Sequence, residues 1–258
     1  MIRVTVCELP HQPAALTPAW ENLCRHTVQR TPDLVLLPEL AMVEPVWECE
    51  QFDLARWADI EALSGEWMQR LQELRARFVV GTRPVSAFGA RYNEGFIWSS
   101  DHGAVPLRRK FFLPDETSYW EARWFEKGDA LFPPFQAGGL TFGLNICTEL
   151  WALETYAQYA ASGVQVILSP RATEPATTGK WLSVGVVAAV RSGAYSVSSN
   201  RVDASGSCGG MGWIVSPDGE ILAVTTPKSP FATVDIDLTV SARARRQYPR
   251  YVFGGATG

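Results

Sequence analysis

The stretch Asp33-Leu34-Val35-Leu36-Leu37 is an uninterrupted apolar run behind one acidic residue, and Pro38-Glu39-Leu40 follows it directly. A continuous apolar run of this length is typical of a β-strand that is covered on both faces. Similar runs occupy residues 78–82 and 140–147, and segments with helical spacing of apolar residues alternate with these runs. The sequence therefore predicts a layered α/β fold with helices outside the sheets.

The same patterns, followed outward from this strand, assign the rest of the chain. Thr17 and Pro18 are typical of an N-cap and a first helical position, so we expect a helix to begin there. No linker-like stretch or internal repeat interrupts the chain, and one domain is expected over residues 1–258. The expected strands are 2–7, 33–37, 78–82, 92–99, 104–110, 140–147, 164–169, 195–199, 211–216, 220–225 and 231–236, and the expected helices are 17–30, 64–77, 153–162 and 180–192.

The charge and hydropathy of the chain exclude several classes of protein. The 258 residues carry a formal net charge of −4, which provides no positive field for nucleic acid or for an anionic membrane surface. The longest apolar runs, such as residues 184–190, fall short of the roughly 20 residues of a membrane helix. Residues 1–6 have the pattern of a strand rather than that of a signal peptide. We expect no nucleic-acid partner, no membrane association and a cytoplasmic location.

The cysteines and histidines are few. The chain has five cysteines and three histidines, with no CxxC motif and no spacing typical of a zinc site. This argues against a disulfide framework and a structural zinc, so we expect reduced thiols and neither metal nor cofactor. The shortage of histidines also limits which group could serve as a base for a nucleophile.

Three reactive side chains lie at or just beyond the carboxyl ends of three expected strands. Glu39 comes after the strand at 33–37, Lys110 ends the strand at 104–110, and Cys147 ends the strand at 140–147. Ligands of open α/β sheets collect at the carboxyl ends of strands, so these side chains are candidates for one site. Taken singly, each has an ordinary structural explanation, because a lone cysteine is more often a small buried apolar residue than a nucleophile. A cysteine nucleophile needs a base, and a carboxylate is the best one available here.

Four stretches, in order along the chain, match segments of one known family. Residues 33–40 match the segment with a catalytic glutamate, and residues 109–114 match the segment with a catalytic lysine. Residues 120–129 match the segment with a second glutamate, and residues 143–149 match the turn that bears a catalytic cysteine. On these stretches the whole chain resembles the nitrilase superfamily, the carbon–nitrogen hydrolases.

The resemblance implies a four-layer αββα sandwich and a catalytic group of Glu39, Lys110, Cys147 and Glu121. Glu39 would take the thiol proton, and the Cys147 thiolate would attack an amide or nitrile carbon. Lys110, with the backbone N–H of Thr148, would stabilise the negative charge that develops.

The second glutamate has two candidates. Glu121 would hold Lys110, because the residues that follow Glu121 match the family pattern. Glu116 is the alternative, since it lies closer to Lys110 in sequence.

The substrate subclass stays open at this point. Cys147-Thr148-Glu149 differs from the Cys-Tyr-Asp or Cys-His-Asp of many family amidases and from the Cys-Trp-Glu of nitrilases. We expect an amidase that converts a small linear amide into an acid and ammonia through a cysteine thioester. A nitrilase, an N-carbamoyl amidohydrolase and, from another class, a non-catalytic binding protein on the same fold are the alternatives.

Several further residues are candidates for contacts. Trp120 and Trp151 flank the proposed catalytic residues and could form an apolar wall of the pocket. Arg171 follows another strand and could pair with a substrate carboxylate, or it could form a salt bridge with Glu174 or a neighbouring subunit.

The family resemblance, together with the aromatic residues of the helix after Cys147, predicts a homodimer or a higher homo-oligomer. The aromatic residues that motivate this prediction are Trp151, Tyr156 and Tyr159.

Overall fold

A computed structural model describes residues 1–203 and 205–254 of the chain, and within this part twelve strands form one hydrogen-bonded array. The main path of the array has the order β5-β4-β3-β2-β1-β9-β8-β7-β6, while β12 pairs with β1, and β10 lies between β9 and β11. The strands are β1 (Ile2–Leu9), β2 (Leu34–Leu36), β3 (Phe78–Ala87), β4 (Ala90–Ser99), β5 (Gly103–Arg109), β6 (Phe135–Ala137), β7 (Leu140–Leu144), β8 (Val166–Arg171), β9 (Tyr195–Arg201), β10 (Trp213–Val215), β11 (Ile221–Val224) and β12 (Phe231–Ile236).

Strand β1 joins two sheets. Along residues 4–6 it pairs in parallel with β2, and at Glu8 and Leu9 it pairs in parallel with Asn200 and Arg201 of β9. The first sheet holds β1 to β5 and β12, and the second holds β6 to β11. Side chains of both sheets form one buried core, so the two sheets pack face to face. The apolar core between them includes Val4, Val6, Leu34 and Leu36 from the first sheet and Leu144, Val166, Leu168 and Val197 from the second.

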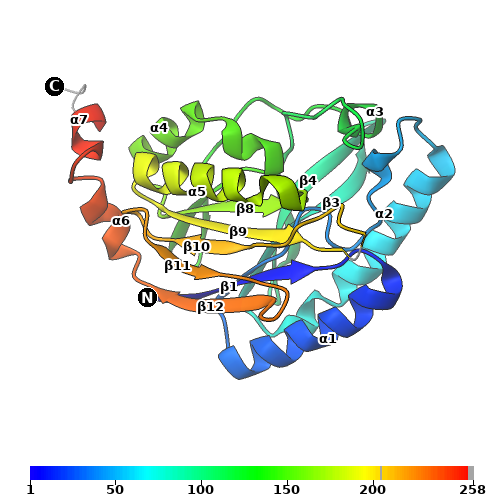
Figure 1. Ribbon diagram of the computed structural model, residues 1–258, viewed down its shortest axis with the longest axis horizontal. Coiled ribbons are helices and arrows are strands. Elements are labelled where there is room, and N and C mark those ends of the chain that lie inside the picture. Colours follow the sequence, from blue (N-terminus) through cyan, green and yellow to red (C-terminus); the bar gives the residue numbers. More distant parts are fainter. Residues whose placement is uncertain (204, 255–258) are drawn as a thin grey trace.

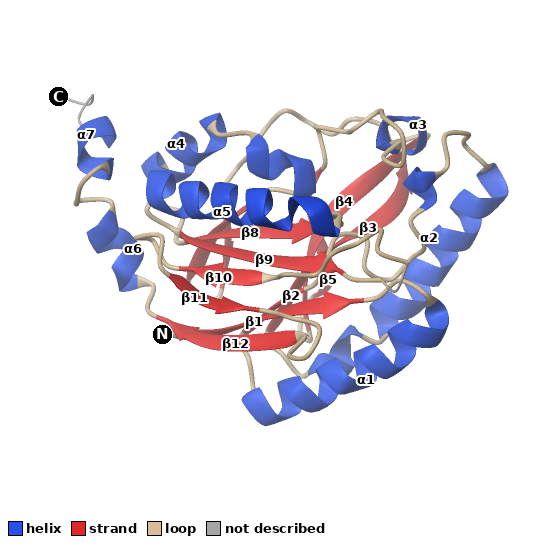
Figure 2. Cartoon of the chain, in the orientation of Figure 1, coloured by secondary structure: helices blue, strands red, loops and turns tan. Residues whose placement is uncertain are grey.

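Helices cover the outer face of each sheet (Figures 1 and 2). α1 (Pro13–Arg30) and α2 (Leu54–Gln69) contribute Trp20 and Trp67 to an apolar cluster that includes Val35 of the first sheet. α4 (Glu154–Ala161) and α5 (Thr178–Ser192) cover the second sheet, where Ala188 packs with Ile167. The layers therefore run helix, sheet, sheet, helix, and the expected four-layer αββα sandwich is confirmed.

The two long N-terminal helices differ from their expected bounds. α1 begins at Pro13, and Pro18 lies inside it, because the earlier proline already occupies the first turn. α2 begins ten residues before the expected start at residue 64, since the carboxylate of Asp53 accepts hydrogen bonds from the backbone N–H groups of Ala55 and Arg56, at 2.8 and 3.2 Å. This N-cap is the signal that the sequence analysis missed.

Short elements escaped the sequence analysis. They are α3 (Glu121–Trp124), α6 (Thr239–Ala244), α7 (Arg250–Gly254), β6 and three 3₁₀ turns, η1 (Val46–Glu48), η3 (Cys147–Trp151) and η4 (Pro175–Thr177). A fourth 3₁₀ turn, η2 (Leu71–Leu74), follows α2 within the helix expected at 64–77. Segments this short contain too few residues for an apolar period to be recognised. The strand expected at 140–147 also ends earlier, at Leu144, and Cys147 begins η3 instead.

The aromatic residues expected at a subunit interface are divided between two environments. Tyr156 and Tyr159 are fully buried within the chain, where they pack between α4 and the second sheet, whereas Trp151 is 46% exposed. The two tyrosines therefore do not form part of an exposed aromatic face. Separately, in the part of the chain that the structure describes, no helix combines the length and the apolar character that a membrane crossing requires.

Candidate active site

Four buried side chains converge where strands of the two sheets end. Glu39 follows β2 and Lys110 follows β5, both in the first sheet, while Cys147 follows β7 in the second. Glu121 is the first residue of α3. Their exposed fractions are 2% for Glu39, 0% for Lys110, 5% for Cys147 and 4% for Glu121. The structure thus brings together all four residues that the sequence analysis named as catalytic.

The ammonium of Lys110 lies between two carboxylates. Its Nζ donates to Glu39 Oε1 at 2.8 Å and to both carboxylate oxygens of Glu121, at 2.8 and 2.7 Å. Glu116 is exposed instead, and no hydrogen bond or ion pair of its side chain is present among the described residues. Of the two candidates for the second glutamate, Glu121 is therefore the one that holds Lys110.

The backbone at Cys147 adopts a conformation that is rare for a residue with a side chain. Its φ is +49°, in the left-handed region, at the start of η3. Such conformations persist only where the surrounding structure holds them, and they concentrate at functional sites. The turn places the thiol at the end of β7 and puts Thr148 beside it on the cavity wall.

Burial keeps the thiol of Cys147 protonated. Loss of solvent is the main cause that raises its pKa well above the ordinary value, and the carboxylates of Glu39 and Glu121 raise it further, against the opposing effect of Lys110. A thiol in this state is a poor nucleophile until a base removes its proton.

The lysine and the second glutamate respond differently to burial. Burial lowers the pKa of Lys110, but the charges of Glu121 and Glu39 outweigh that effect and raise the pKa above its ordinary value, so the side chain stays an ammonium ion. Burial raises the pKa of Glu121 to about 7, although Lys110 pulls it down. The site therefore holds a permanent cation beside a carboxyl group that can change its protonation state near neutral pH.

Asn93 of β4 orients Glu39, and the sequence analysis did not identify it. Its side-chain Nδ2 donates to Glu39 Oε1 at 2.8 Å, and its backbone carbonyl oxygen accepts from the backbone N–H of Lys110 at 2.9 Å. Asn93 is 1% exposed, so the contact is shielded from water. A buried amide inside a strand was the available signal, but its partner lies 54 residues away in the chain.

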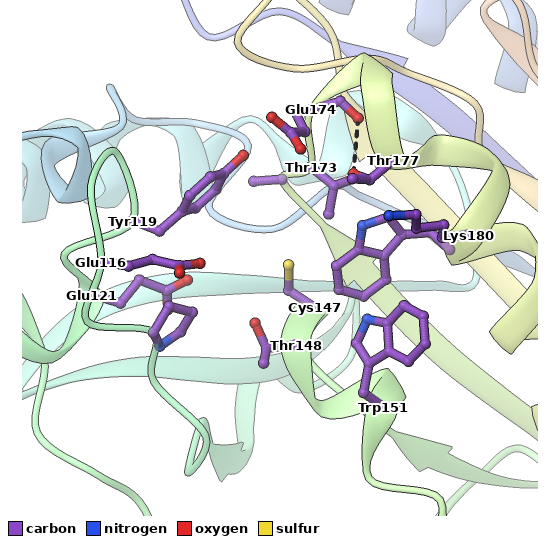
Figure 3. A pocket seen from close by; sticks show the side chains of 13 residues that line it. Glu116, Tyr119, Glu121, Cys147, Thr148, Trp151, Thr173, Glu174, Thr177 and Lys180 are labelled. Carbon is purple, nitrogen blue, oxygen red and sulfur yellow. Dashed lines mark hydrogen bonds between the residues drawn. The ribbon is translucent and has the colours of Figure 1, made fainter.

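A cavity of about 240 Å³ opens above Cys147 (Figure 3). In this view Glu116, Tyr119 and Glu121 lie on one side of the sulfur, and Trp151 and Lys180 lie on the other. Thr148 and Trp151 line the cavity as the sequence analysis expected. The lining residues that it did not assign to the cavity are Pro114, Tyr119, Ala172, Thr173, Glu174, Thr177, Lys180 and Trp181.

Two expected contacts with the substrate are corrected, those of Arg171 and Trp120, because neither residue lines the cavity. The guanidinium of Arg171 is fully buried and donates to Ser198 Oγ at 2.7 Å, to Thr173 Oγ1 at 2.9 Å and to the carbonyl oxygen of Met211 at 2.6 Å. These bonds tie the end of β8 to β9 and to Met211, and Arg171 forms no salt bridge with Glu174 among the described residues. Trp120 precedes α3, and its backbone N–H donates to the carbonyl oxygen of Trp47 at 2.7 Å.

Among the described residues, no three histidine, cysteine, aspartate or glutamate side chains are grouped as metal ligands. Near Cys147, the two buried carboxylates of Glu39 and Glu121 already share the ammonium of Lys110. A buried thiol beside these carboxylates and this ammonium ion can perform nucleophilic attack, with proton transfer by a carboxylate and charge stabilisation by the ammonium ion.

Comparison with known proteins identifies the family of the chain. A family model described as carbon-nitrogen hydrolase matches residues 3–246. N-carbamoylputrescine amidase of Oryza sativa subsp. japonica is 26% identical over 247 residues, which cover 86% of this chain and 81% of that protein. Omega-amidase NIT2 of Homo sapiens is 29% identical over 203 residues, which cover 73% of each.

Solved structures share the fold. A carbon-nitrogen hydrolase from Helicobacter pylori G27 superposes with a TM-score of 0.84 at 20% identity, covering 97% of this chain and 94% of that one. An amidase from Nesterenkonia sp. AN1, with acrylamide added to its active-site cysteine, superposes with a TM-score of 0.76 at 17% identity, covering 98% of this chain and 100% of that one.

Proposed function

The chain belongs to the carbon–nitrogen hydrolase family, and we propose that it is an amidase that converts a small linear amide into an acid and ammonia through a thioester on Cys147. One observation carries the proposal. Lys110 is held between Glu39 and Glu121 in a buried group that also contains the thiol, and Glu121 and Cys147 of this group line a cavity. A base, a cation and a nucleophile are thus supplied from three separate segments.

The first half of the reaction forms the thioester. Glu39 accepts the proton of the Cys147 thiol, and the sulfur attacks the carbonyl carbon of the amide. The carbonyl oxygen becomes an oxyanion, which the ammonium of Lys110 and the backbone N–H of Thr148 stabilise. Glu39 then gives its proton to the amide nitrogen, and the C–N bond breaks. Ammonia leaves, and the acyl group remains on Cys147 as a thioester.

The second half returns the enzyme to its starting state. Water enters the position that ammonia has left, and Glu39 removes a proton from it as it attacks the thioester carbon. The same two donors stabilise the second oxyanion. When the C–S bond breaks, the proton on Glu39 passes to the sulfur, so the acid is released and the thiol is restored.

Glu121 acts on Lys110 and on the group that leaves or enters. Both of its oxygens accept from the ammonium, so it fixes the direction in which Lys110 points. It also lines the cavity, where it can accept a hydrogen bond from the amide NH₂ group or from the attacking water. Burial raises the pKa of Glu121 to about 7. Its ionised form supports Lys110 best, because both oxygens then accept from the ammonium.

A carbamoyl substrate is the second candidate, because relatives of the chain are described as N-carbamoylputrescine amidases. The thiol would attack a carbamoyl carbon in the same way, and the products would include carbon dioxide as well as ammonia. A nitrile would yield the same products as an amide, an acid and ammonia, so it is distinguished by the substrate that is consumed. A binding protein without turnover would yield none of these products.

Product analysis with a panel of short amides, N-carbamoyl amines and nitriles tests the proposal. We expect the wild-type protein to release ammonia and the matching acid from at least one amide, without carbon dioxide. Carbon dioxide released from carbamoyl compounds alone would favour the second candidate. The Cys49→Ala variant is the matched control for Cys147→Ala, since Cys49 is an exposed thiol outside the cavity.

The domain organisation, location and oligomeric state of the protein remain predictions. We propose that the chain works as one domain, that it is cytoplasmic, and that it forms a homodimer or a higher homo-oligomer. The oligomer prediction now depends on the family resemblance and on the exposed ring of Trp151, because Tyr156 and Tyr159 are buried.

A further inference from the structure

Glu149 is a fully buried carboxylate beside the proposed active site, and the mechanism above gives it no role. It lies two residues after Cys147, within η3. Its Oε2 accepts from the backbone N–H of Ile146 at 2.8 Å, and its Oε1 accepts from the backbone N–H of Phe111 at 2.7 Å. Arg108 donates to both oxygens, with Nη2 at 3.0 Å from Oε1.

The contact with Ile146 closes the turn around the nucleophile. The backbone N–H of Glu149 donates to the carbonyl oxygen of Ile146 at 3.1 Å, while the Glu149 carboxylate accepts from the N–H of the same residue. Cys147 and Thr148 are the two residues inside this ring of hydrogen bonds. The ring thus holds Cys147 at its positive φ of 49°, which would otherwise cost free energy.

The contact with Phe111 reaches the segment that carries Lys110. Phe111 is the residue after Lys110, and the rest of that backbone is held by a bond from Lys110 N–H to Asn93 (2.9 Å) and a bond from Gly128 N–H to Lys110 (2.8 Å). β5 and β7, which deliver the lysine and the cysteine, lie in different sheets and do not pair with each other. Glu149 therefore connects two segments that no β-ladder connects.

Arg108 allows this carboxylate to be buried in its charged form. The side chains of Arg108 and Glu149 are 5% and 0% exposed, and Arg108 also donates to the carbonyl oxygen of Leu131 at 3.2 Å. A buried carboxylate with this many donors forms charge-assisted hydrogen bonds, which are shorter and stronger than neutral ones. Each of its four donors belongs to the turn of Cys147 or to the segment around Lys110.

We propose that Glu149 is a positioning residue that sets the Cys147 turn relative to Lys110, so that the Thr148 N–H and the ammonium point at the same oxyanion. This inference rests on the proposed function. Donors that are misplaced by about 1 Å can cost about 10²-fold in rate, and the cost falls on the transition state rather than on substrate binding. A merely structural ion pair would affect stability and leave the turnover of the folded protein unchanged.

Glu149→Gln and the double variant Arg108→Gln/Glu149→Gln test the proposal. The amide has one acceptor oxygen, and its NH₂ group would face donors, so it cannot serve both backbone N–H groups. We expect kcat on an amide substrate to fall about 10²-fold with KM nearly unchanged, in protein shown to be folded by circular dichroism. The double variant removes both buried charges together, so it should fold even where the single variant does not.

Two further measurements separate positioning from general damage. Alkylation of Cys147 by iodoacetamide needs the thiolate but no oxyanion, so its rate should fall much less than kcat. Glu149→Asp restores a carboxylate, so it should recover part of the lost kcat. Glu154→Gln is the matched control, because Glu154 is an exposed glutamate at the start of α4, outside the cavity.

The outcomes distinguish this inference from the proposed function. A folded Glu149→Gln or double variant with wild-type kcat would overturn the positioning role. Turnover that survives in Cys147→Ala would instead overturn the proposed function. A variant whose kcat and alkylation rate fall equally would point to loss of the base or of the thiol environment, and would also overturn the positioning role.

Discussion

Lys110 donates to both carboxylate oxygens of Glu121, at 2.8 and 2.7 Å, and both side chains are almost completely buried. This contact decides between two glutamates that the sequence alone left as alternatives. It also means that the cation of the site cannot move without breaking two short, charge-assisted hydrogen bonds. The geometry of Lys110 is thus fixed before any substrate arrives.

Replacing Glu39 should block formation of the thioester. Glu39→Gln keeps the shape of the side chain but cannot accept the proton of a thiol whose pKa is raised by burial. Loss of a general base typically costs about 10²–10⁴ in rate. Single-turnover mass spectrometry should find no acyl adduct on the time scale of wild-type turnover. Acylation at the wild-type rate would rule out Glu39 as the base.

Replacing Glu121 should have a later effect. Glu121→Gln leaves Glu39 in place, so the thioester should form, but Lys110 loses its strongest partner and the attacking water is less well oriented. The acyl adduct should therefore accumulate, which the same mass measurement detects. Glu126→Gln, an exposed glutamate near α3, is the control. Normal turnover of Glu121→Gln together with an inactive Glu116→Gln would contradict the assignment.

Removing Asn93 should weaken catalysis through Glu39. Its side chain donates to Glu39 Oε1 at 2.8 Å, and a hydrogen bond to a charged group contributes about 1.5–3 kcal/mol. Asn93→Ala should lower kcat/KM by roughly 10- to 100-fold, since 1.4 kcal/mol corresponds to tenfold. The exposed Asn22→Ala serves as a control in the same kinetic assay. Equal kcat/KM for both variants would show that Asn93 does not orient the base.

The raised pKa of Glu121 predicts a specific dependence of stability on pH. The ordinary pKa of this side chain is 4.5 and its folded value is about 7, so between these values the folded state binds more protons than the unfolded state. Its contribution to the free energy of unfolding therefore falls as pH rises through this window, by about 3 kcal/mol in total, and is constant above it. Lys110 and Cys147 have raised pKa values, so they change stability only above the ordinary values of 10.5 and 9.0.

Urea unfolding of wild type and Glu121→Gln at pH 5 and pH 8 measures this effect. The glutamine side chain does not titrate, so wild type should lose roughly 2 to 3 kcal/mol more than the variant between the two pH values, because part of the total change already occurs below pH 5. Parallel pH dependence in both proteins would show that burial does not raise the pKa of Glu121.

Local patterns made three of the four buried residues candidates. Glu39 and Cys147 stand at or just beyond runs of apolar residues, and Lys110 ends a strand of a predicted pair, so the rule for strand ends singled them out, whereas Glu121 and the catalytic roles came from the family resemblance. The layered fold followed from the same buried strands, because apolar runs and helical periods are local signals.

The residues that sequence reasoning misplaced depend on contacts distant in sequence. Arg171 is at a strand end like the catalytic residues, but Ser198 and the carbonyl oxygen of Met211 bind its guanidinium, and no local pattern shows this. Asn93 and Glu149 were not assigned roles because their partners lie 54 and 38 residues away, on Glu39 and Phe111. The start of α2 was missed for a local reason, since the cap at Asp53 was overlooked.

The central claim is that Cys147 carries the acyl group during turnover, and intact-mass spectrometry during incubation with short amides tests it most directly. Wild type and Cys49→Ala should each gain the mass of the acyl group, located on Cys147 by peptide mapping, while Cys147→Ala should gain no mass and show no turnover. An adduct on another cysteine, or hydrolysis that persists in Cys147→Ala, would contradict the account.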